Sequence, residues 1–216
     1  MSRVLRKILI ADDHGAMRRG LRDLLAENPH GRIVAEAADG HQALEMAREA
    51  RPDIAIIDYS LPSLNGLDLT RALKRELPDI EVLIYTMHDR EEVLADVLRA
   101  GARGYVLKSD SELHLQAAVE AMAERRPYFS GMVSEALLKH FLDNSLPHAD
   151  LNALTTRERE VVQLIAEGQI NKRIAHILDI SVKTVETHRA AAMHKLRLKT
   201  TAELVRYALR NNIIEA

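Results

Sequence analysis

The chain has 216 residues, of which 47% are hydrophobic and 29% are charged, so it can form one large core or two modest ones. It contains no cysteine, which excludes disulfide and thiol chemistry, and no apolar run is long enough to cross a bilayer. The formal net charge of −2 is unevenly divided. Residues 151–216 carry 11 Lys and Arg against 7 Asp and Glu, whereas residues 1–150 carry 19 against 25. This asymmetry indicates an acidic module joined to one that could bind a polyanion.

The first residues lack the apolar core of a secretory signal, and we expect a cytoplasmic protein without a membrane segment.

Short apolar runs alternate with amphipathic stretches through the first half of the chain. In the first such stretch Met17, Leu21, Leu24 and Leu25 share one helical face. Alternation of this kind predicts a doubly wound α/β domain with five parallel strands over residues 1–126. The expected strands are Lys7–Ala11, Ile33–Ala37, Ile54–Ile57, Val82–Tyr85 and Gly104–Leu107, and a helix over Ser111–Arg125 closes the domain.

Polar side chains stand at the ends of four of these strands. Asp12 and Asp13 follow the first strand and Asp58 the third, while Thr86 ends the fourth and Lys108 follows the fifth. Because ligands gather beyond the carboxyl ends of parallel strands, we expect these side chains in one cleft. Three carboxylates resist ionisation together unless a cation lies among them, and Mg²⁺ prefers oxygen ligands. The strand ends thus predict a Mg²⁺ site where the Asp58 carboxylate attacks a phosphoryl group, assisted by Thr86 and Lys108.

Each of these residues alone has a simpler explanation. An Asp after a strand is usually a turn former or a helix cap, and a tyrosine in a strand, such as Tyr105, usually belongs to the core. The ordered set is more specific, and it resembles the receiver domain of bacterial two-component response regulators over roughly residues 5–125. The resemblance is carried by Asp12-Asp13, by Asp58 with Leu61-Pro62 and Gly66 after it, by Thr86, and by the segment Ala100–Lys108.

The resemblance to receivers implies a role for each matched residue. Asp58 would accept a phosphoryl group from a sensor histidine kinase. Asp12, Asp13 and Asp58 would hold Mg²⁺, with the backbone carbonyl of Tyr59 beside them. Thr86 and Tyr105 would move together on phosphorylation and reshape the face formed by the fourth helix and the fifth strand.

Residues 127–150 are expected to be a linker. Pro127 ends the preceding helix, and residues 144–148 have the composition of a turn. A short amphipathic helix between them is predicted, either as a moving part or as a cap packed on the first domain. Its expected apolar residues are Val133, Leu137, Leu138 and Phe141.

From Leu154 onward the pattern is helical, which predicts an all-α domain over residues 151–216. Capping-box spacing marks the first helix at Thr155–Glu158 and the last at Thr200–Glu203. A short helix over residues 171–178 and a turn precede a helix with two distinct faces. The apolar face holds Val182, Val185, Ala192, Met193 and Leu196, and the polar stripe holds Lys183, Glu186, Thr187, Ala190, His194 and Arg197. Two such helices predict a helix-turn-helix, although a polar stripe is more often a solvated face.

The second half of the chain resembles the LuxR-type DNA-binding domain, and its pairing with a receiver resembles the NarL/FixJ class. The segments that carry the resemblance are Leu154–Val161, Asn171–Ala175 and Ser181–Arg189. It implies binding of double-stranded DNA, with Glu186, Thr187 and Ala190 at base edges in the major groove. The residues expected to contact DNA phosphates are Lys172, Thr184, Lys195 and Lys199. Lys183, on the polar stripe, is a further expected DNA contact.

Two further expectations concern the last helices. In the LuxR-type family the final helix pairs two domains, which would read inverted half-sites roughly 10 base pairs apart. Arg189 falls on the apolar side of its helix, and we predict that it forms a buried salt bridge with Glu158 or Glu160.

The predicted protein is therefore a phosphorylation-controlled transcription factor and not an enzyme, apart from assisting its own phosphoryl transfer. Its expected partners are a sensor histidine kinase, DNA, a second copy when phosphorylated, and RNA polymerase. Two alternatives compete with this interpretation. An aspartyl-phosphate phosphatase needs a second Asp two residues after Asp58, where this chain has Ser60. A DNA-binding scaffold that is never phosphorylated does not explain the complete set of receiver residues.

Overall fold

The computed structural model describes residues 5–26, 28–131, 133–135 and 154–214. The chain divides into two compact units, Met1–Pro147 and His148–Ala216. In the described part of the chain, no helix has the length and apolar character needed to span a membrane. The predicted linker helix lies mostly outside the described residues: Val133 is described and buried, whereas Leu137, Leu138 and Phe141 are not described.

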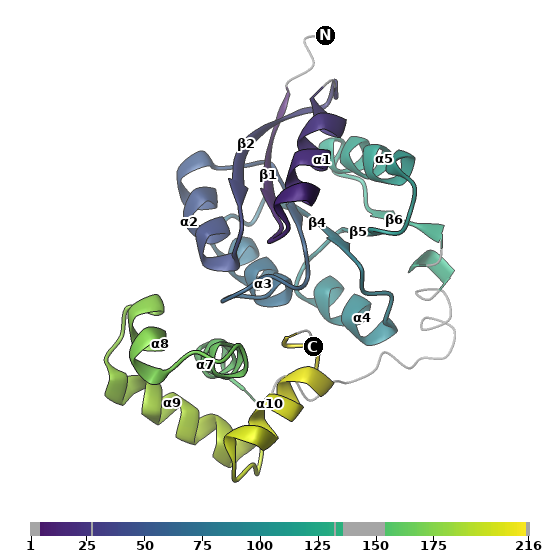
Figure 1. Ribbon diagram of the computed structural model, residues 1–216. Helices are drawn as coiled ribbons and strands as arrows, with labels where there is room; N and C mark the ends of the chain where they lie inside the picture. The colour runs from purple at the N-terminus through teal and green to yellow at the C-terminus, as the bar shows by residue number, and fades with distance from the viewer. Residues whose placement is uncertain (1–4, 27, 132, 136–153, 215–216) are drawn as a thin grey trace. The chain divides into compact units, whose positions relative to one another are not determined.

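A six-stranded parallel sheet lies at the centre of the first unit (Figure 1). Its strand order is β2-β1-β3-β4-β5-β6, which confirms the predicted doubly wound fold. The five predicted strands are β1 (Arg6–Ala11), β2 (Gly31–Ala37), β3 (Ile54–Ile57), β4 (Glu81–Thr86) and β5 (Gly104–Leu107). A sixth strand, β6 (Tyr128–Phe129), pairs in parallel with β5 and was not predicted. With two residues it is too short to show a periodic pattern.

Helices cover both faces of the sheet. On one face lie α1 (Gly15–Leu25) and α5 (Glu112–Ala123), and on the other lie α2 (Gly40–Ala50), α3 (Gly66–Glu76) and α4 (Glu91–Arg99) (Figure 1). Because both faces are covered, the central strands are buried along their whole length, which explains why their sequences do not alternate.

The core of the first unit lies between the sheet and its helices. Ile8, Ile10, Ile54 and Ile56 belong to one buried cluster that also contains Leu21 of α1. Side chains of α5 complete the cluster, so the central strands are clamped against that face. The strand ends therefore extend from strands that this buried cluster holds in place.

The register of the strands decides which residues meet at the carboxyl edge of the sheet. Ala11 pairs with Ile57, and Ile57 pairs with Ile84. Thr86 pairs with Leu107. The residues that follow β1, β3 and β5 therefore come together with the end of β4 at a single edge, as the strand pattern predicted.

The second unit consists of helices α7 (Thr156–Ala166), α8 (Asn171–Ile177), α9 (Val182–Lys195) and α10 (Thr201–Arg210). Both predicted capping boxes are present, at the start of α7 and of α10. Apolar side chains from all four helices form one core cluster. The prediction that Val182 belongs to the buried face is wrong: it is the first residue of α9 and 40% exposed, because the core begins one turn later at Val185.

Candidate functional site

Three charged side chains form the buried centre of the site at the carboxyl edge of the sheet. The Nζ atom of Lys108 lies 2.7 Å from Oδ2 of Asp12 and 2.6 Å from Oδ2 of Asp58. All three side chains are at most 5% exposed. Burial works against the charge of Lys108, but the carboxylates of Asp58 and Asp12 outweigh it and raise the pKa of the ammonium group. Lys108 thus stays charged and holds the two carboxylates together.

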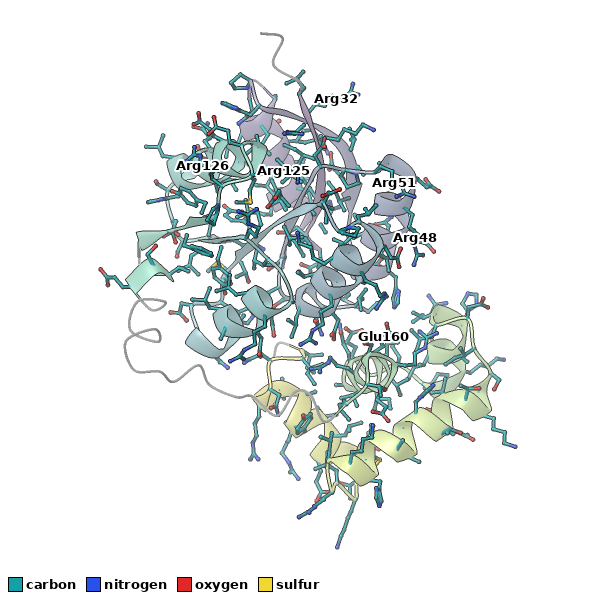
Figure 2. The ribbon with its side chains drawn as sticks, turned by 180° about the vertical axis from the view of Figure 1, so that it is seen from behind. Arg32, Arg48, Arg51, Arg125, Arg126 and Glu160 are labelled. Carbon is teal, nitrogen blue, oxygen red and sulfur yellow. The ribbon has the colours of Figure 1, made fainter. Side chains whose placement is uncertain are left out.

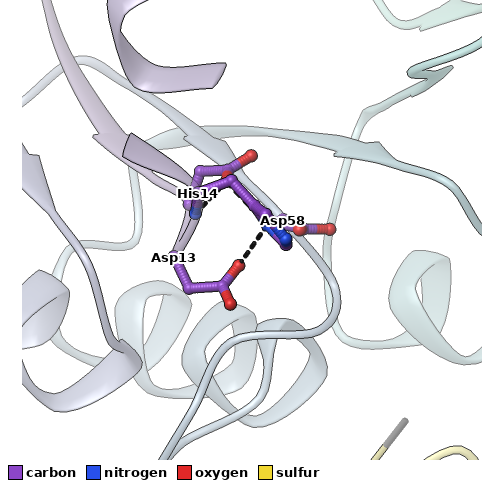
Figure 3. Close-up of side chains that lie close together, drawn as sticks. Asp13, His14 and Asp58 are labelled. Atoms are coloured by element: carbon purple, nitrogen blue, oxygen red, sulfur yellow. Dashed lines mark hydrogen bonds and ion pairs between the residues drawn. The ribbon is translucent and has the colours of Figure 1, made fainter. Parts of the chain in front are cut away.

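Asp13 completes the predicted group of acids, and His14 joins it. One ligand atom from each of Asp12, Asp13, His14 and Asp58 can be chosen so that all lie within 4.8 Å of one another (Figure 3). The three carboxylates form an oxygen donor set of the kind that Mg²⁺ prefers. His14 was not among the predicted ligands, because only oxygen ligands were expected around Mg²⁺; its position directly after Asp13 was the available signal.

The loop after β3 holds Asp58 in place through close backbone packing. The N–H group of Gly66 donates to the carbonyl of Tyr59 at 2.8 Å, and a Cβ atom at Gly66 would lie 2.4 Å from the carbonyl oxygen of Asp58. Asn65 then caps α3 by accepting from the N–H of Asp68. Glycine is therefore required where the chain turns back onto Asp58. The Tyr59 carbonyl, which was expected beside the metal, is already an acceptor within this turn.

Thr86 and Tyr105 both contact the segment that follows β4. Thr86 is buried, and its Oγ1 atom accepts from the N–H of His88 at 3.4 Å. The Tyr105 hydroxyl donates to the carbonyl of His88 at 2.8 Å, and the side chain is buried, which raises the pKa of its hydroxyl. The imidazole of His88 lies 2.8 Å from Oγ of Ser60, in the loop after Asp58. His88 therefore connects the two expected switch residues with the loop that carries Asp58.

The polar stripe of α9 is exposed as predicted. Ser181 caps the helix, and Val185 and Ala192 turn the opposite face into the core. The exposed residues of the stripe are Lys183, Glu186, Thr187, Ala190, His194 and Arg197. Lys172 and Lys199 are also exposed, and Thr184 is half-buried beside Ser181. These side chains are available to a ligand, and their contacts with DNA remain a prediction.

Lys195 differs from the other predicted DNA contacts because it has a partner within the domain. Its Nζ atom lies 2.7 Å from Oε2 of Glu158, a side chain that is almost completely buried. Glu158 also accepts from the N–H of Thr155 in the capping box of α7. Lys195 thus ties the end of α9 to the start of α7.

The prediction that Arg189 forms a buried salt bridge with Glu158 or Glu160 is wrong. Arg189 instead donates from Nη2 to Oγ1 of Thr201 at 2.6 Å. Glu158 forms an ion pair with Lys195 at the end of α9. Glu160, which is labelled in Figure 2, forms an ion pair with Arg157 at 2.7 Å. Both acids already have cationic partners, so the guanidinium group reaches the first turn of α10.

An α/β unit with acids and a lysine at its carboxyl edge, followed by a helix-turn-helix unit, defines a class of two-domain regulators. Residues 8–120 match the family described as "Response regulator receiver domain", and residues 152–208 match "Bacterial regulatory proteins, luxR family". The chain belongs to the two-component response regulators of the LuxR-type, NarL/FixJ family. It is a transcription factor and not a catalytic enzyme, which confirms the prediction and excludes the phosphatase alternative.

Full-length relatives support this membership. The chain is 39% identical over 216 residues to the oxygen regulatory protein NreC of Staphylococcus epidermidis, covering 97% of this chain and 99% of that protein. A structure of two RcsB dimers bound to two parallel DNAs matches with a TM-score of 0.60 and 27% identity, over 94% of this chain and 98% of that one. RcsB of Salmonella enterica serovar Typhimurium, bound to promoter rprA in the presence of phosphomimetic BeF3⁻, matches with a TM-score of 0.59 and 28% identity over the same shares.

Proposed function

We propose that a sensor histidine kinase phosphorylates Asp58 and that this modification controls dimerisation and sequence-specific DNA binding. The observation that carries the proposal is the position of Lys108 between the carboxylates of Asp12 and Asp58. A buried carboxylate can attack phosphorus, and the fixed ammonium group beside it stabilises the negative charge of the phosphoryl oxygens. The carboxylate forms the new bond to phosphorus, and the bond to the imidazole nitrogen of the kinase breaks.

Asp12, Asp13 and Asp58 would hold Mg²⁺ in this pocket. The ion, when bound, offsets charge on the transferring phosphoryl oxygens. The residues of the chain supply the rest: Asp12 keeps Lys108 at the reaction centre, and Thr86 offers a hydroxyl group to a phosphoryl oxygen. The modification adds about 1.5 to 2 negative charges and three acceptor oxygens beside Lys108.

Phosphorylation would change the conformation of the segment that follows β4. If Thr86 is drawn toward the phosphoryl group, its contact with His88 changes, and the carbonyl of His88 also holds the hydroxyl of Tyr105. A shift in population then requires that the two arrangements of this segment differ in affinity for the phosphoryl group or for a second copy. Tyr105 is already buried in this structure, so the proposed movement begins with Thr86 and the backbone of His88.

The output would be DNA binding by α9 as half of a pair. The exposed stripe on α9 supports this role, as do the RcsB dimers on DNA. We propose that α10 pairs two copies, that the paired domains read inverted half-sites, and that RNA polymerase is the further partner. Because its target is bacterial DNA, the protein would act in the cytoplasm.

The test compares Asp58→Asn with the wild type after treatment with acetyl phosphate and Mg²⁺. Analytical ultracentrifugation and binding to a selected DNA should show a response in the wild type and none in the variant, because an amide cannot accept the phosphoryl group. Asp79→Asn is the matched control, since the Asp79 side chain is 92% exposed and should leave the response intact. An equal response of Asp58→Asn and wild type would refute the phosphorylation switch.

A further inference from the structure

We propose that His14 adds an imidazole ligand to the acidic pocket and gives it selectivity for a first-row transition ion such as Ni²⁺ over Mg²⁺. The inference rests on the proposed metal site, but it concerns which ion the site prefers. It is carried by a residue outside the three acids, because His14 supplies the only nitrogen in this donor set.

The distances around His14 match those of ligands that share one ion. Nδ1 of His14 lies 2.8 Å from Oδ1 of Asp13 and 3.6 Å from Oδ1 of Asp12 (Figure 3). Bonds of about 2.0–2.2 Å from an ion to nitrogen or oxygen place neighbouring ligands about 3 Å apart. An ion shared by His14, Asp13 and Asp12 would replace the present contact between Nδ1 and Asp13, with only small shifts of these three side chains.

The backbone holds His14 at this position. It is the N-cap residue of α1, and its N–H group donates to Oδ1 of Asp12 at 2.8 Å. Asp12 is itself held by Lys108 through Oδ2, and its carbonyl accepts from Arg18 of α1 at 2.6 Å. The side chain of His14 is 70% exposed, so the imidazole faces the pocket from the solvent side, where an ion would enter. His14 is thus fixed at its backbone, and its exposed ring contacts Asp13 through Nδ1.

Charge and donor chemistry together favour this assignment. The pocket holds three carboxylates, and its neighbouring cations are the ammonium group of Lys108 and the guanidinium group of Arg18 at the Asp12 carbonyl. A surplus of negative charge remains that a divalent ion would offset. Neutral imidazole suits Zn²⁺, Cu²⁺ and Ni²⁺, whereas carboxylate and water suit Mg²⁺. A nitrogen ligand should therefore change the preference among divalent ions and leave Mg²⁺ binding nearly unaltered.

The experiment measures the affinity of the full-length protein for Ni²⁺ and for Mg²⁺ by calorimetry at one fixed pH. In His14→Gln we expect the Kd for Ni²⁺ to rise about tenfold or more, as expected for loss of a group that supports a metal site. The Kd for Mg²⁺ should change less than twofold. The matched control is His30→Gln, because His30 also lies near a carboxylate, 3.6 Å from Glu120, and should leave both affinities unchanged.

A second readout identifies the ligand directly. Paramagnetic Ni²⁺, added below one equivalent, should broaden the imidazole NMR signals of His14 before those of other histidines, and Mg²⁺ should reverse the effect. Equal Ni²⁺ affinity in His14→Gln and wild type would overturn the inference and leave His14 as a surface partner of Asp13. If Asp13→Asn binds both ions as the wild type does, the acidic pocket is not the metal site, and that part of the proposed function fails as well.

Discussion

Lys108, Asp12 and Asp58 form a group of charges in which both carboxylates contact the same ammonium group. The three side chains are buried, and the ammonium group lies within 2.7 Å of an oxygen atom of each acid. Without the ammonium group, Asp12 and Asp58 would be two buried carboxylates that repel each other with no cation between them. The contact that we propose prepares Asp58 for phosphoryl transfer therefore also stabilises the carboxyl edge of the sheet.

Replacing Lys108 by methionine should destabilise the receiver by about 3–5 kcal/mol, because it leaves two buried carboxylates without their cation. Chemical unfolding at neutral pH measures this loss. Mg²⁺ should recover more stability in Lys108→Met than in the wild type, since the ion can replace the missing charge among the acids. Arg126→Met, at an exposed pair with Glu124, is the control and should unfold like the wild type. Identical Mg²⁺ effects in both proteins would count against a metal among these carboxylates.

At the scale of elements, Glu158 joins two helices of the DNA-binding domain. It closes the capping box of α7 and accepts from Lys195 at the end of α9. Burial works against its charge, but hydrogen bonds from Lys195 and Thr155 outweigh the effect of burial and lower the pKa of the carboxyl group. The position of α9 thus depends partly on an ionised carboxylate.

The stabilising effect of Glu158 should depend on pH. Its pKa is lower in the folded than in the unfolded state, so the unfolded state binds more protons, and the contribution is complete above about pH 4.5 and lost as pH falls. Near neutral pH, Glu158→Gln should lower the free energy of unfolding by about 1–3 kcal/mol. The difference from the wild type should shrink below about pH 4.5 in denaturation series. Glu186→Gln, on the exposed stripe of α9, should show no such dependence; a difference that persists in acid would exclude the ionised contact.

At the scale of the whole molecule, the acidic pocket and the exposed polar stripe belong to different units of the chain. The acidic pocket lies in the first unit and the exposed stripe of α9 in the second, and the net charges of the two halves have opposite signs. Binding to a polyanion by the more basic unit should release counterions and weaken with salt. A lysine that contacts a phosphate can be identified because its replacement makes this salt dependence less steep.

Lys172→Ala should lower the slope of log K against log salt concentration by about 0.9, because one phosphate contact is lost. Fluorescence anisotropy with the full-length, phosphorylated protein and a selected duplex measures the slope. The control is Arg32→Ala in β2 of the receiver, an exposed arginine labelled in Figure 2, which should leave the slope unchanged. An unchanged slope in Lys172→Ala would remove this residue from the DNA interface.

Local patterns were sufficient for most of the fold and for the acids of the pocket. Apolar runs broken by Pro and Gly predicted five strands, and the two capping boxes predicted the starts of α7 and α10, because a strand or a cap is encoded by residues close together in the chain. Asp12, Asp58 and Lys108 could be placed together because parallel strands end at a common edge.

Side-chain partners were decided by packing between segments that are distant in the chain. The angular position of Arg189 on its helix predicted a contact with Glu158 or Glu160, but those acids are taken by other cations and Arg189 reaches Thr201. A long flexible side chain selects among all groups within its reach, and only the folded structure brings those groups together. The short strand β6 depended in the same way on an open edge of β5, which no local pattern in its two residues could reveal.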